Sequence, residues 1–407
     1  MSTISRTPIH LAVIAPPLAL LSALISLSDI PIRVPEPYVV GVTSESVSAV
    51  FLIAPIAAAL AAWEAGRVRR AGWHRWPNAR PMYAVALRAL KPVVAVALFA
   101  LATGILARFV RSDLVTLPDL ALVTKAVAIV VTHALLGFAV GLELPATLAA
   151  PSMLILDYAW MVLPVSLQPV WLRHLNGTWI SCCAVYVEIA PRAWWAAIII
   201  ALAIGIVGLV LMTKWPALHR GVTVTGVGVA AAVIASVLVS ELGPDPTEPR
   251  NSAELVCSES KPRVCVWPEH GGRLLTVANL VVTATSAWRT VGLPVGEEYT
   301  EQRSAVGDGI QIFGFTPHSR DADIVAGLAS GVVPMARCDP SAPPLRDARD
   351  YARAWLLQAA SVDPRRAGYP IEVAQTVDAV RGKPMELQRQ WLSARLACVA
   401  VIPTEAQ

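Results

Sequence analysis

Seven stretches of mostly apolar residues, each close to the length of a membrane-spanning helix, most constrain what this chain can fold into. They run approximately over 10–28, 46–63, 92–110, 120–140, 152–170, 193–212 and 221–240. A helix of about 20 apolar residues crosses the hydrocarbon core of a bilayer. Only 15% of the residues are charged, against about a quarter in soluble domains. The sequence therefore predicts an α-helical polytopic membrane bundle of about seven spans over residues 1–240.

The first stretch, HLAVIAPPLALLSALISL, could also be read as a secretory signal peptide. Its basic region holds only Arg6, no clear small-x-small cleavage site follows, and six more apolar stretches come after it. We therefore interpret it as an uncleaved first span. The fifth stretch is the least apolar, because it contains Asp157, Pro164 and Gln168.

Lys and Arg are concentrated in one connecting segment, and this orients the bundle. Residues 64–91 lie between the second and third spans and contain Arg67, Arg69, Arg70, Arg75, Arg80, Arg88 and Lys91. Such a segment belongs in the cytoplasm, and alternation then leaves the N-terminus inside. Everything after the seventh span lies outside. We therefore expect a multi-pass protein of the plasma membrane with an extracytoplasmic C-terminal domain.

The cysteines agree with this orientation, because all six fall on the predicted oxidising side. They are Cys182 and Cys183 in the loop 171–192, and Cys257, Cys265, Cys338 and Cys398 in the tail. Disulfides persist in oxidising compartments. The spacing of the first two tail cysteines and His270 fits no common zinc pattern, so we predict disulfides and no metal. Connectivity stays open: Cys182 and Cys183 form a vicinal redox pair, or pair with cysteines elsewhere.

The tail begins with the proline-rich stretch GPDPTEPRNS, which predicts a linker over 241–255. Residues 256–407 then predict a small α+β or mainly helical domain. RVCVW and GIQIFGF are strand candidates. Helices are expected in RLLTVANLVVTATSAWRTVG, DADIVAGLASGVV, PLRDARDYARAWLLQAA and PMELQRQWLSARLACVAV.

Three ionisable residues lie inside predicted spans, where such groups are costly and are functional candidates by default. They are Lys125, His133 and Asp157. His133 and Asp157 fall at similar depth on consecutive helices, so a hydrogen bond between them is expected. Lys125 lies near the outer end and is expected to reach the interface. The alternative is that all three are structural anchors. Gly137 and Gly141, four residues apart, predict a close approach of two helices.

Motifs for nucleotide binding and hydrolysis are absent from the sequence. It has no G-x4-G-K-[ST], H-E-x-x-H or G-x-S-x-G pattern. We therefore expect no enzyme activity, no cofactor and no nucleic-acid partner in this chain. The remaining enzymatic reading is a hydrolytic site that uses Glu269 and His270.

Six spans with a basic cytoplasmic segment after the second resemble the permease subunit of an ABC-2-type exporter. The stretch GFAVGLELPATLAAPSMLILDYAWMVLP is similar in character to ABC-2-like membrane proteins of actinomycetes. The resemblance implies a separate ATPase subunit that contacts the region of Trp76, Arg80, Tyr83 and Leu87. It also allows a homodimer. The seventh span and the outer domain depart from the usual pattern.

Three functions follow as hypotheses. The first is the membrane component of an ABC-type exporter that works with a separate ATPase. The second is a membrane-anchored binding or sensing protein whose extracytoplasmic domain takes a ligand. The third is a membrane-bound metal-dependent hydrolase acting through Glu269 and His270. Co-purification of an ATPase favours the first, and zinc in the purified tail favours the third.

Overall fold

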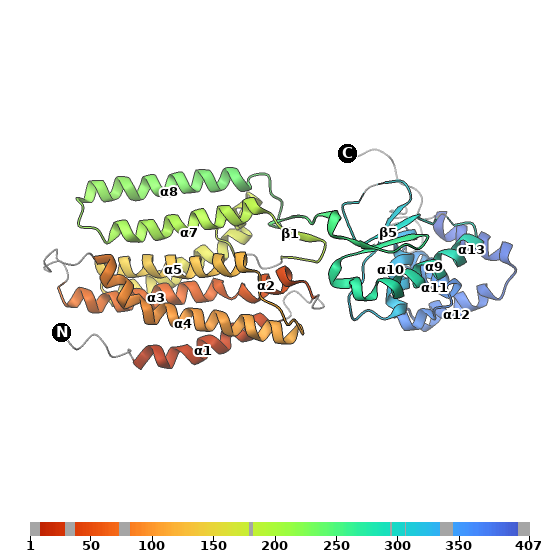
Figure 1. Ribbon diagram of the computed structural model, residues 1–407, viewed down its shortest axis with the longest axis horizontal. Helices are drawn as coiled ribbons and strands as arrows, with labels where there is room; N and C mark the ends of the chain where they lie inside the picture. The colour runs from red at the N-terminus through yellow and green to blue at the C-terminus, as the bar shows by residue number, and fades with distance from the viewer. Residues whose placement is uncertain are drawn as a thin grey trace. The chain divides into compact units, whose positions relative to one another are not determined.

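The computed structural model describes residues 9–28, 37–72, 82–178, 182–293, 295–305, 307–333 and 345–397. The chain divides into two compact units, Met1–Glu248 and Pro249–Gln407 (Figure 1). We call them unit 1 and unit 2. The division falls inside the stretch predicted as a linker.

Unit 1 is a bundle of helices, and each of the seven predicted spans corresponds to a helical segment. The helices are α1 (Ile9–Leu27), α2 (Val39–Val47), α3 (Val50–Arg70), α4 (Met82–Arg111), α5 (Leu120–Glu143), α6 (Ala146–Val162), α7 (Pro191–Leu211) and α8 (Ala217–Val239). Within the described ranges, six helical segments are long and apolar enough to cross a bilayer, with α2 and α3 together forming one of them. The shorter apolar helix α1 packs along α4.

Short elements complete unit 1. The 3-10 turns η2 (Leu163–Ser166) and η3 (Val170–His174) follow α6, and β1 (Val187–Ile189) precedes α7. β1 pairs with β2 (Thr247–Pro249), the strand that follows α8. The segment 171–192, predicted as an outer loop, therefore contains most of one 3-10 turn, η3, and one short strand, β1.

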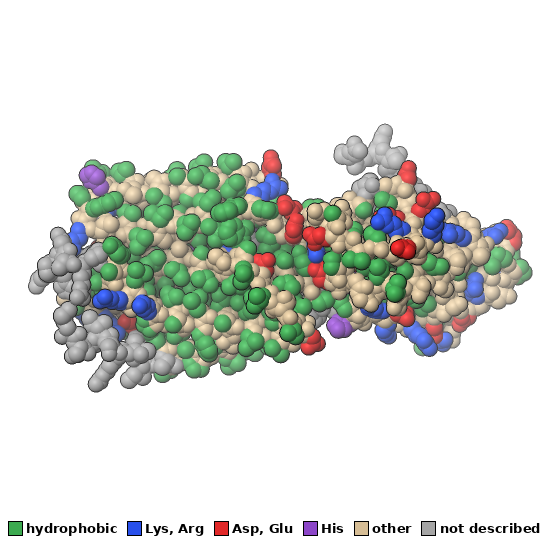
Figure 2. Space-filling view, in the orientation of Figure 1, with side chains coloured by type: hydrophobic (Ala, Val, Ile, Leu, Met, Phe, Trp, Pro, Cys, Tyr) green, Lys and Arg blue, Asp and Glu red, His purple; other side chains and the backbone are tan. Residues whose placement is uncertain are grey.

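The outer surface of unit 1 is apolar along the helices, as Figure 2 shows in green. Leu106, Ile155 and Val237 are among its large exposed side chains. Exposed tryptophans lie at both ends of α7, Trp195 near its start and Trp215 just beyond its end. Tryptophan favours the two membrane–water interfaces. This distribution is that of a bundle whose flanks face lipid.

The two glycines predicted from GFAVG make a close helix contact in the bundle. A Cβ atom added at Gly137 would lie 2.1 Å from the carbonyl oxygen of Ala58, and one at Gly141 would lie 2.3 Å from that of Ala62. Only glycine lets the backbones of α3 and α5 approach this closely. The predicted close packing is confirmed, and the partner helix is α3.

Unit 2 combines a four-stranded sheet with helices, which matches the α+β form of the prediction. The strands are β3 (Val256–Cys257), β4 (Arg263–Val266), β5 (Glu298–Thr300) and β6 (Ile310–Ile312), in the order β3-β4-β5-β6. β3 is antiparallel to β4, and β4, β5 and β6 are parallel. Because parallel strands need crossover connections, helix α9 (Leu274–Thr290) lies between β4 and β5 in the chain.

Four further helices follow the sheet and close the core of unit 2. They are α10 (Asp321–Val332), α11 (Leu345–Ala359), α12 (Ile371–Arg381) and α13 (Met385–Ala397), with short 3-10 turns at η4 (Ser252–Glu254), η5 (Pro268–Arg273) and η6 (Pro364–Ala367). Trp288, Tyr299 and Trp355 are fully buried between these elements. The strands β3 and β5 and the helix α12 were not predicted from the sequence.

Candidate functional sites in the two units

Helix α4 is longer than one crossing of a bilayer requires, and its first turns carry exposed side chains at one end of unit 1. Its 30 residues extend over about 45 Å at 1.5 Å per residue, against about 30 Å for the hydrocarbon core. If its last 20 residues cross the core, residues 82–91 project beyond it. Helix α3 also projects at this end. Gly141, two residues before the end of α5, lies against Ala62, and α3 continues beyond that contact to Arg70.

The projecting turns of α4 carry an apolar and cationic face, which we call the basic-end surface: Tyr83, Leu87, Arg88 and Lys91. Tyr83 and Leu87 are 56% and 55% exposed, and the two basic residues are exposed as well. Spacings of four residues put Tyr83, Leu87 and Lys91 on one side of the helix. Figure 2 shows basic side chains at this end of the apolar bundle. Trp76 and Arg80 lie outside the described residues.

In the middle of the bundle, His133 of α5 and Asp157 of α6 form the predicted hydrogen bond. Nδ1 of His133 lies 2.5 Å from Oδ1 of Asp157, and the residues are only 2% and 6% exposed. Oδ2 of Asp157 is buried and has no hydrogen-bond partner among the described residues. A carboxyl group can take part in more than one hydrogen bond, so Asp157 has hydrogen-bonding capacity that this pair does not use.

Among the described residues, no Lys, Arg, Asp, Glu or second His reaches the depth of this pair from the helices packed on α5; Tyr158 follows Asp157 on α6. Helices α2 and α3 carry none between Glu45 and Glu64, and α4 carries none between Lys91 and Arg108. The lipid-spanning part of α7 carries none after Arg192. Among the described residues, His133 and Asp157 are therefore the one pair of this kind in a largely apolar layer, where the cost of charge is greatest.

Lys125 does not reach the membrane interface, so that part of the prediction is wrong. The side chain is only 2% exposed, and Nζ donates to the carbonyl oxygen of Gly177 at 2.7 Å. The chain after α6 folds back into the bundle and covers the lysine. Neither composition nor spacing distinguishes such a segment from an exposed loop.

The sequence analysis also missed an ion pair near the same end of the bundle as Lys125. Arg108 of α4 is buried and donates to Glu45 of α2. Ser26 of α1 offers its carbonyl oxygen to the same guanidinium at 3.4 Å. Arg108 stands near the end of an apolar run, a position from which arginine usually reaches the headgroups. Here the partner is Glu45 of α2, whose side chain is partly exposed.

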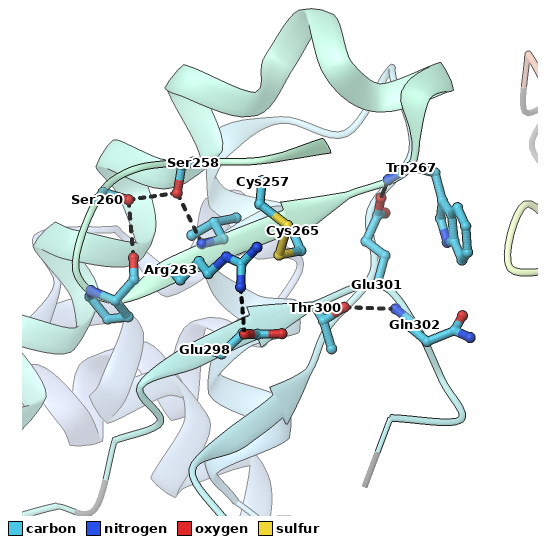
Figure 3. Close-up of a disulfide and its surroundings, with 12 residues drawn as sticks. Cys257, Ser258, Ser260, Arg263, Cys265, Trp267, Glu298, Thr300, Glu301 and Gln302 are labelled. Atoms are coloured by element: carbon cyan, nitrogen blue, oxygen red, sulfur yellow. Dashed lines mark hydrogen bonds and ion pairs between the residues drawn. A yellow bond between two sulfur atoms is a disulfide. The ribbon is translucent and has the colours of Figure 1, made fainter. Parts of the chain in front are cut away.

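Two disulfides occur among the described residues. Cys182 bonds to its neighbour Cys183, and both are buried in unit 1. Cys257 bonds to Cys265 with an S–S distance of 2.06 Å, across directly paired positions of β3 and β4. Figure 3 shows this second bond at the edge of the sheet. Cys338 and Cys398 lie outside the described residues.

Beside this disulfide, unit 2 contains a buried network of charged and polar side chains. Glu301 follows β5 and accepts hydrogen bonds from the backbone N–H of Trp267 at 2.9 Å and from Nδ1 of His270 at 2.8 Å (Figure 3 shows the first). Arg250 lies over the Trp267 ring, 4.7 Å from its centroid, and pairs with Glu269 at 3.0 Å. Glu269 and His270 therefore have different partners.

Three buried polar atoms of this network lack a hydrogen-bond partner in the described part of the chain. They are Nε1 of Trp267, Nε2 of His270 and Oε1 of Gln302. Gln302 joins the network through Nε2, which donates to the carbonyl oxygen of Arg250 at 3.0 Å. Buried polar groups normally have partners, so this region has unused capacity for water or a small polar ligand. Within the described ranges, no cluster of three or more His, Cys, Asp or Glu side chains could hold a metal ion.

Comparison with known proteins reaches unit 2 alone. A family model described as a domain of unknown function, DUF7224, matches residues 264–401. The match runs from β4 to beyond α13 and includes His270, Glu301 and Gln302. No curated protein matches the chain. No solved structure matches it.

Proposed function

We propose that this chain is the membrane component of an exporter that works with a separate ATPase subunit. The basic-end surface carries the proposal. Tyr83 and Leu87 expose apolar side chains in the first turns of α4, and Arg88 and Lys91 flank them. Aromatic, aliphatic and arginine side chains together are typical of the centres of protein interfaces.

A docking site for a soluble subunit explains the exposed leucine better than contact with headgroups alone. Cationic residues bind anionic headgroups without apolar neighbours, whereas a protein partner can bury Tyr83 and Leu87. The resemblance of the membrane part to ABC-2-type permeases implies that a separate ATPase contacts this region. The chain has no phosphate-binding loop of its own, so ATP-driven transport needs the second subunit.

The test is affinity purification of the full-length protein in mild detergent, with mass spectrometry of the proteins that accompany it. We expect a stoichiometric ATPase, and we expect the double variant Tyr83→Ala, Leu87→Ala to lose it. The matched control is Phe99→Ala, Leu106→Ala, which alters two similarly exposed side chains in the lipid-facing part of the same helix. Absence of any ATPase, in detergent that keeps a known transporter complex intact, would overturn the proposal.

The buried network of unit 2 favours a second candidate function, a membrane-anchored receptor for a small polar ligand. This candidate is supported by three buried polar atoms, one each on Trp267, His270 and Gln302, that have no hydrogen-bond partner among the described residues. This function needs no ATPase, so a negative purification combined with loss of activity on deleting unit 2 would favour it. A metal-dependent hydrolase using Glu269 and His270 has less support, because their partners are Arg250 and Glu301.

A further inference from the structure

Residues 173–178, which we call the inserted segment, join two parts of unit 1 that are distant in the sequence. One end contacts residues 240–248, the linker that leads from α8 to unit 2. The other end is buried among α5, α6 and α7. All of these contacts lie within unit 1.

The linker end of the segment is formed by Arg173 and His174. His174 is completely buried, and its Nε2 donates to the carbonyl oxygen of Gly243 at 2.9 Å. Arg173 donates from Nη1 to the carbonyl oxygen of Pro244 at 3.5 Å. A further bond, from the N–H of Ala190 to the carbonyl oxygen of Pro246 at 3.0 Å, holds the linker nearby. The linker is therefore fixed to this segment by specific bonds.

The bundle end of the segment caps helix α6. Nδ2 of Asn176 and Oγ1 of Thr178 donate to the carbonyl oxygen of Met161, at 2.9 and 3.0 Å. The last carbonyl groups of a helix have no partner within it. These side chains bond to two of them, because Nδ2 of Asn176 also lies 3.2 Å from the carbonyl oxygen of Trp160. Asn176 is only 4% exposed. The side-chain NH2 group of Asn176 thus bonds to the end of α6.

Gly177 makes this insertion possible. Its φ of +70° belongs to the left-handed region, which glycine adopts without strain. A Cβ atom there would also lie 3.0 Å from Cδ1 of Ile129 and 3.1 Å from Cβ of Ala197. The carbonyl oxygen of Gly177 accepts the bond from Lys125. The segment thus contacts α5 and α7 as well as α6.

These contacts reach the turns that carry the central polar pair. Met161 lies one helical turn from Asp157 on α6, and Ile129 lies one turn from His133 on α5. A continuous set of bonds and packed side chains therefore connects the linker to the turns beside the His133–Asp157 hydrogen bond.

We propose that the inserted segment is a coupling element through which unit 2 regulates the membrane bundle. A change of unit 2 that displaces the linker moves His174, and the segment transmits this to the turns of α5 and α6 beside the central pair. Coupling of this kind is reciprocal, so a change within the bundle also alters the linker. The proposal is independent of the basic-end surface and of any ATPase.

The test is hydrogen–deuterium exchange of the full-length protein in lipid nanodiscs, read by mass spectrometry. His174→Ala removes the bond to Gly243. We expect faster exchange in the linker 240–248 and also in the bundle peptides around 125–133 and 157–163, by up to about tenfold, the range of one net hydrogen bond. His174→Gln, which keeps a donor, should restore most of the protection. His219→Ala, at an exposed position at the other end of α8, should change neither region.

The reverse direction uses Gly177→Ala, which should loosen the linker although the altered residue does not touch it. Its control is Gly292→Ala, which replaces a glycine of similar φ, +80°, with open space around it. Unchanged exchange in α4 and α9 verifies that the variants are folded. Faster exchange confined to residues 173–178 and the linker in His174→Ala, or a linker unaffected by Gly177→Ala, would overturn the coupling proposal.

Discussion

Glu301 is the residue on which the buried network of unit 2 depends most. Its carboxylate accepts the N–H of Trp267 and Nδ1 of His270, and its side chain has almost no contact with water. Removing one partner of a buried, hydrogen-bonded pair leaves the other polar group without compensation.

His270→Ala should therefore lower the free energy of unfolding of unit 2 by about 3–5 kcal/mol, the usual cost of breaking a buried pair. Glu254→Gln is the matched control. It alters the half-exposed partner of Arg250 and should cost less than about 1 kcal/mol. Chemical denaturation of the full-length protein, followed by a probe in unit 2, measures both. Equal losses in the two variants would contradict the central role of Glu301.

Tyr299 makes unit 2 sensitive to alkali. Burial of the ring in the core raises the pKa of Tyr299 to about 12, above the usual value of about 10. Between these values the unfolded chain releases the phenolic proton and the folded chain retains it. The contribution to stability is complete below pH 10 and is lost as pH rises toward 12, by at most about 1.4 kcal/mol per pH unit. Tyr299→Phe should remove this slope in alkaline denaturation experiments.

The glycines of the bundle differ in how closely a neighbouring helix packs against them. Gly137 of α5 lies against the backbone of α3, whereas a Cβ atom at Gly226 of α8 would meet nothing within 4 Å. The two positions have the same residue type in similar apolar helices, so they form a matched pair for substitution.

Gly137→Ala should destabilise the bundle by about 1–3 kcal/mol or more, because the helices must separate to admit the methyl group. Gly226→Ala should be neutral or stabilise by up to about 1 kcal/mol, through helix propensity alone. Thermal unfolding in detergent compares them. A destabilising effect at Gly226 would indicate that a neighbour covers α8 in the membrane.

The periodicity and length of apolar runs were sufficient to predict the helices of unit 1 and most elements of unit 2. These signals depend only on residues close together in the sequence. The His133–Asp157 bond was predicted in the same way, from the position of each residue within its own span. The prediction for Lys125 was wrong, and the ion pair of Arg108 was missed. In both cases the partner, Gly177 or Glu45, comes from a segment distant in the chain. Likewise, the short strand β5 is stabilised by pairing with β4 and β6, and its three residues carry no pattern of their own.

On the scale of the whole molecule, two compact units imply two unfolding events. The bond Cys257–Cys265 closes a short loop in unit 2 alone. A loop of this size contributes about 2.5 kcal/mol through the entropy of the unfolded chain. The double variant Cys257→Ser, Cys265→Ser should therefore lower the unfolding temperature of unit 2 and leave that of unit 1 unchanged. Calorimetry of the full-length protein can separate the two transitions, and an equal shift in both would contradict independent units.

The sparse packing of α8 has a mechanical consequence. Only Ala231, Ala235 and Val239 of this helix are buried, and the linker to unit 2 begins where the helix ends. A force applied to the carboxyl-terminal part of the chain first breaks the pairing of β2 with β1 and the bond between Ala190 and Pro246. It then breaks the bonds of Arg173 and His174 to the linker, and only then acts on α8. Single-molecule pulling should extract α8 from the membrane as a separate, low-force step while α7, which packs against α5, stays in place.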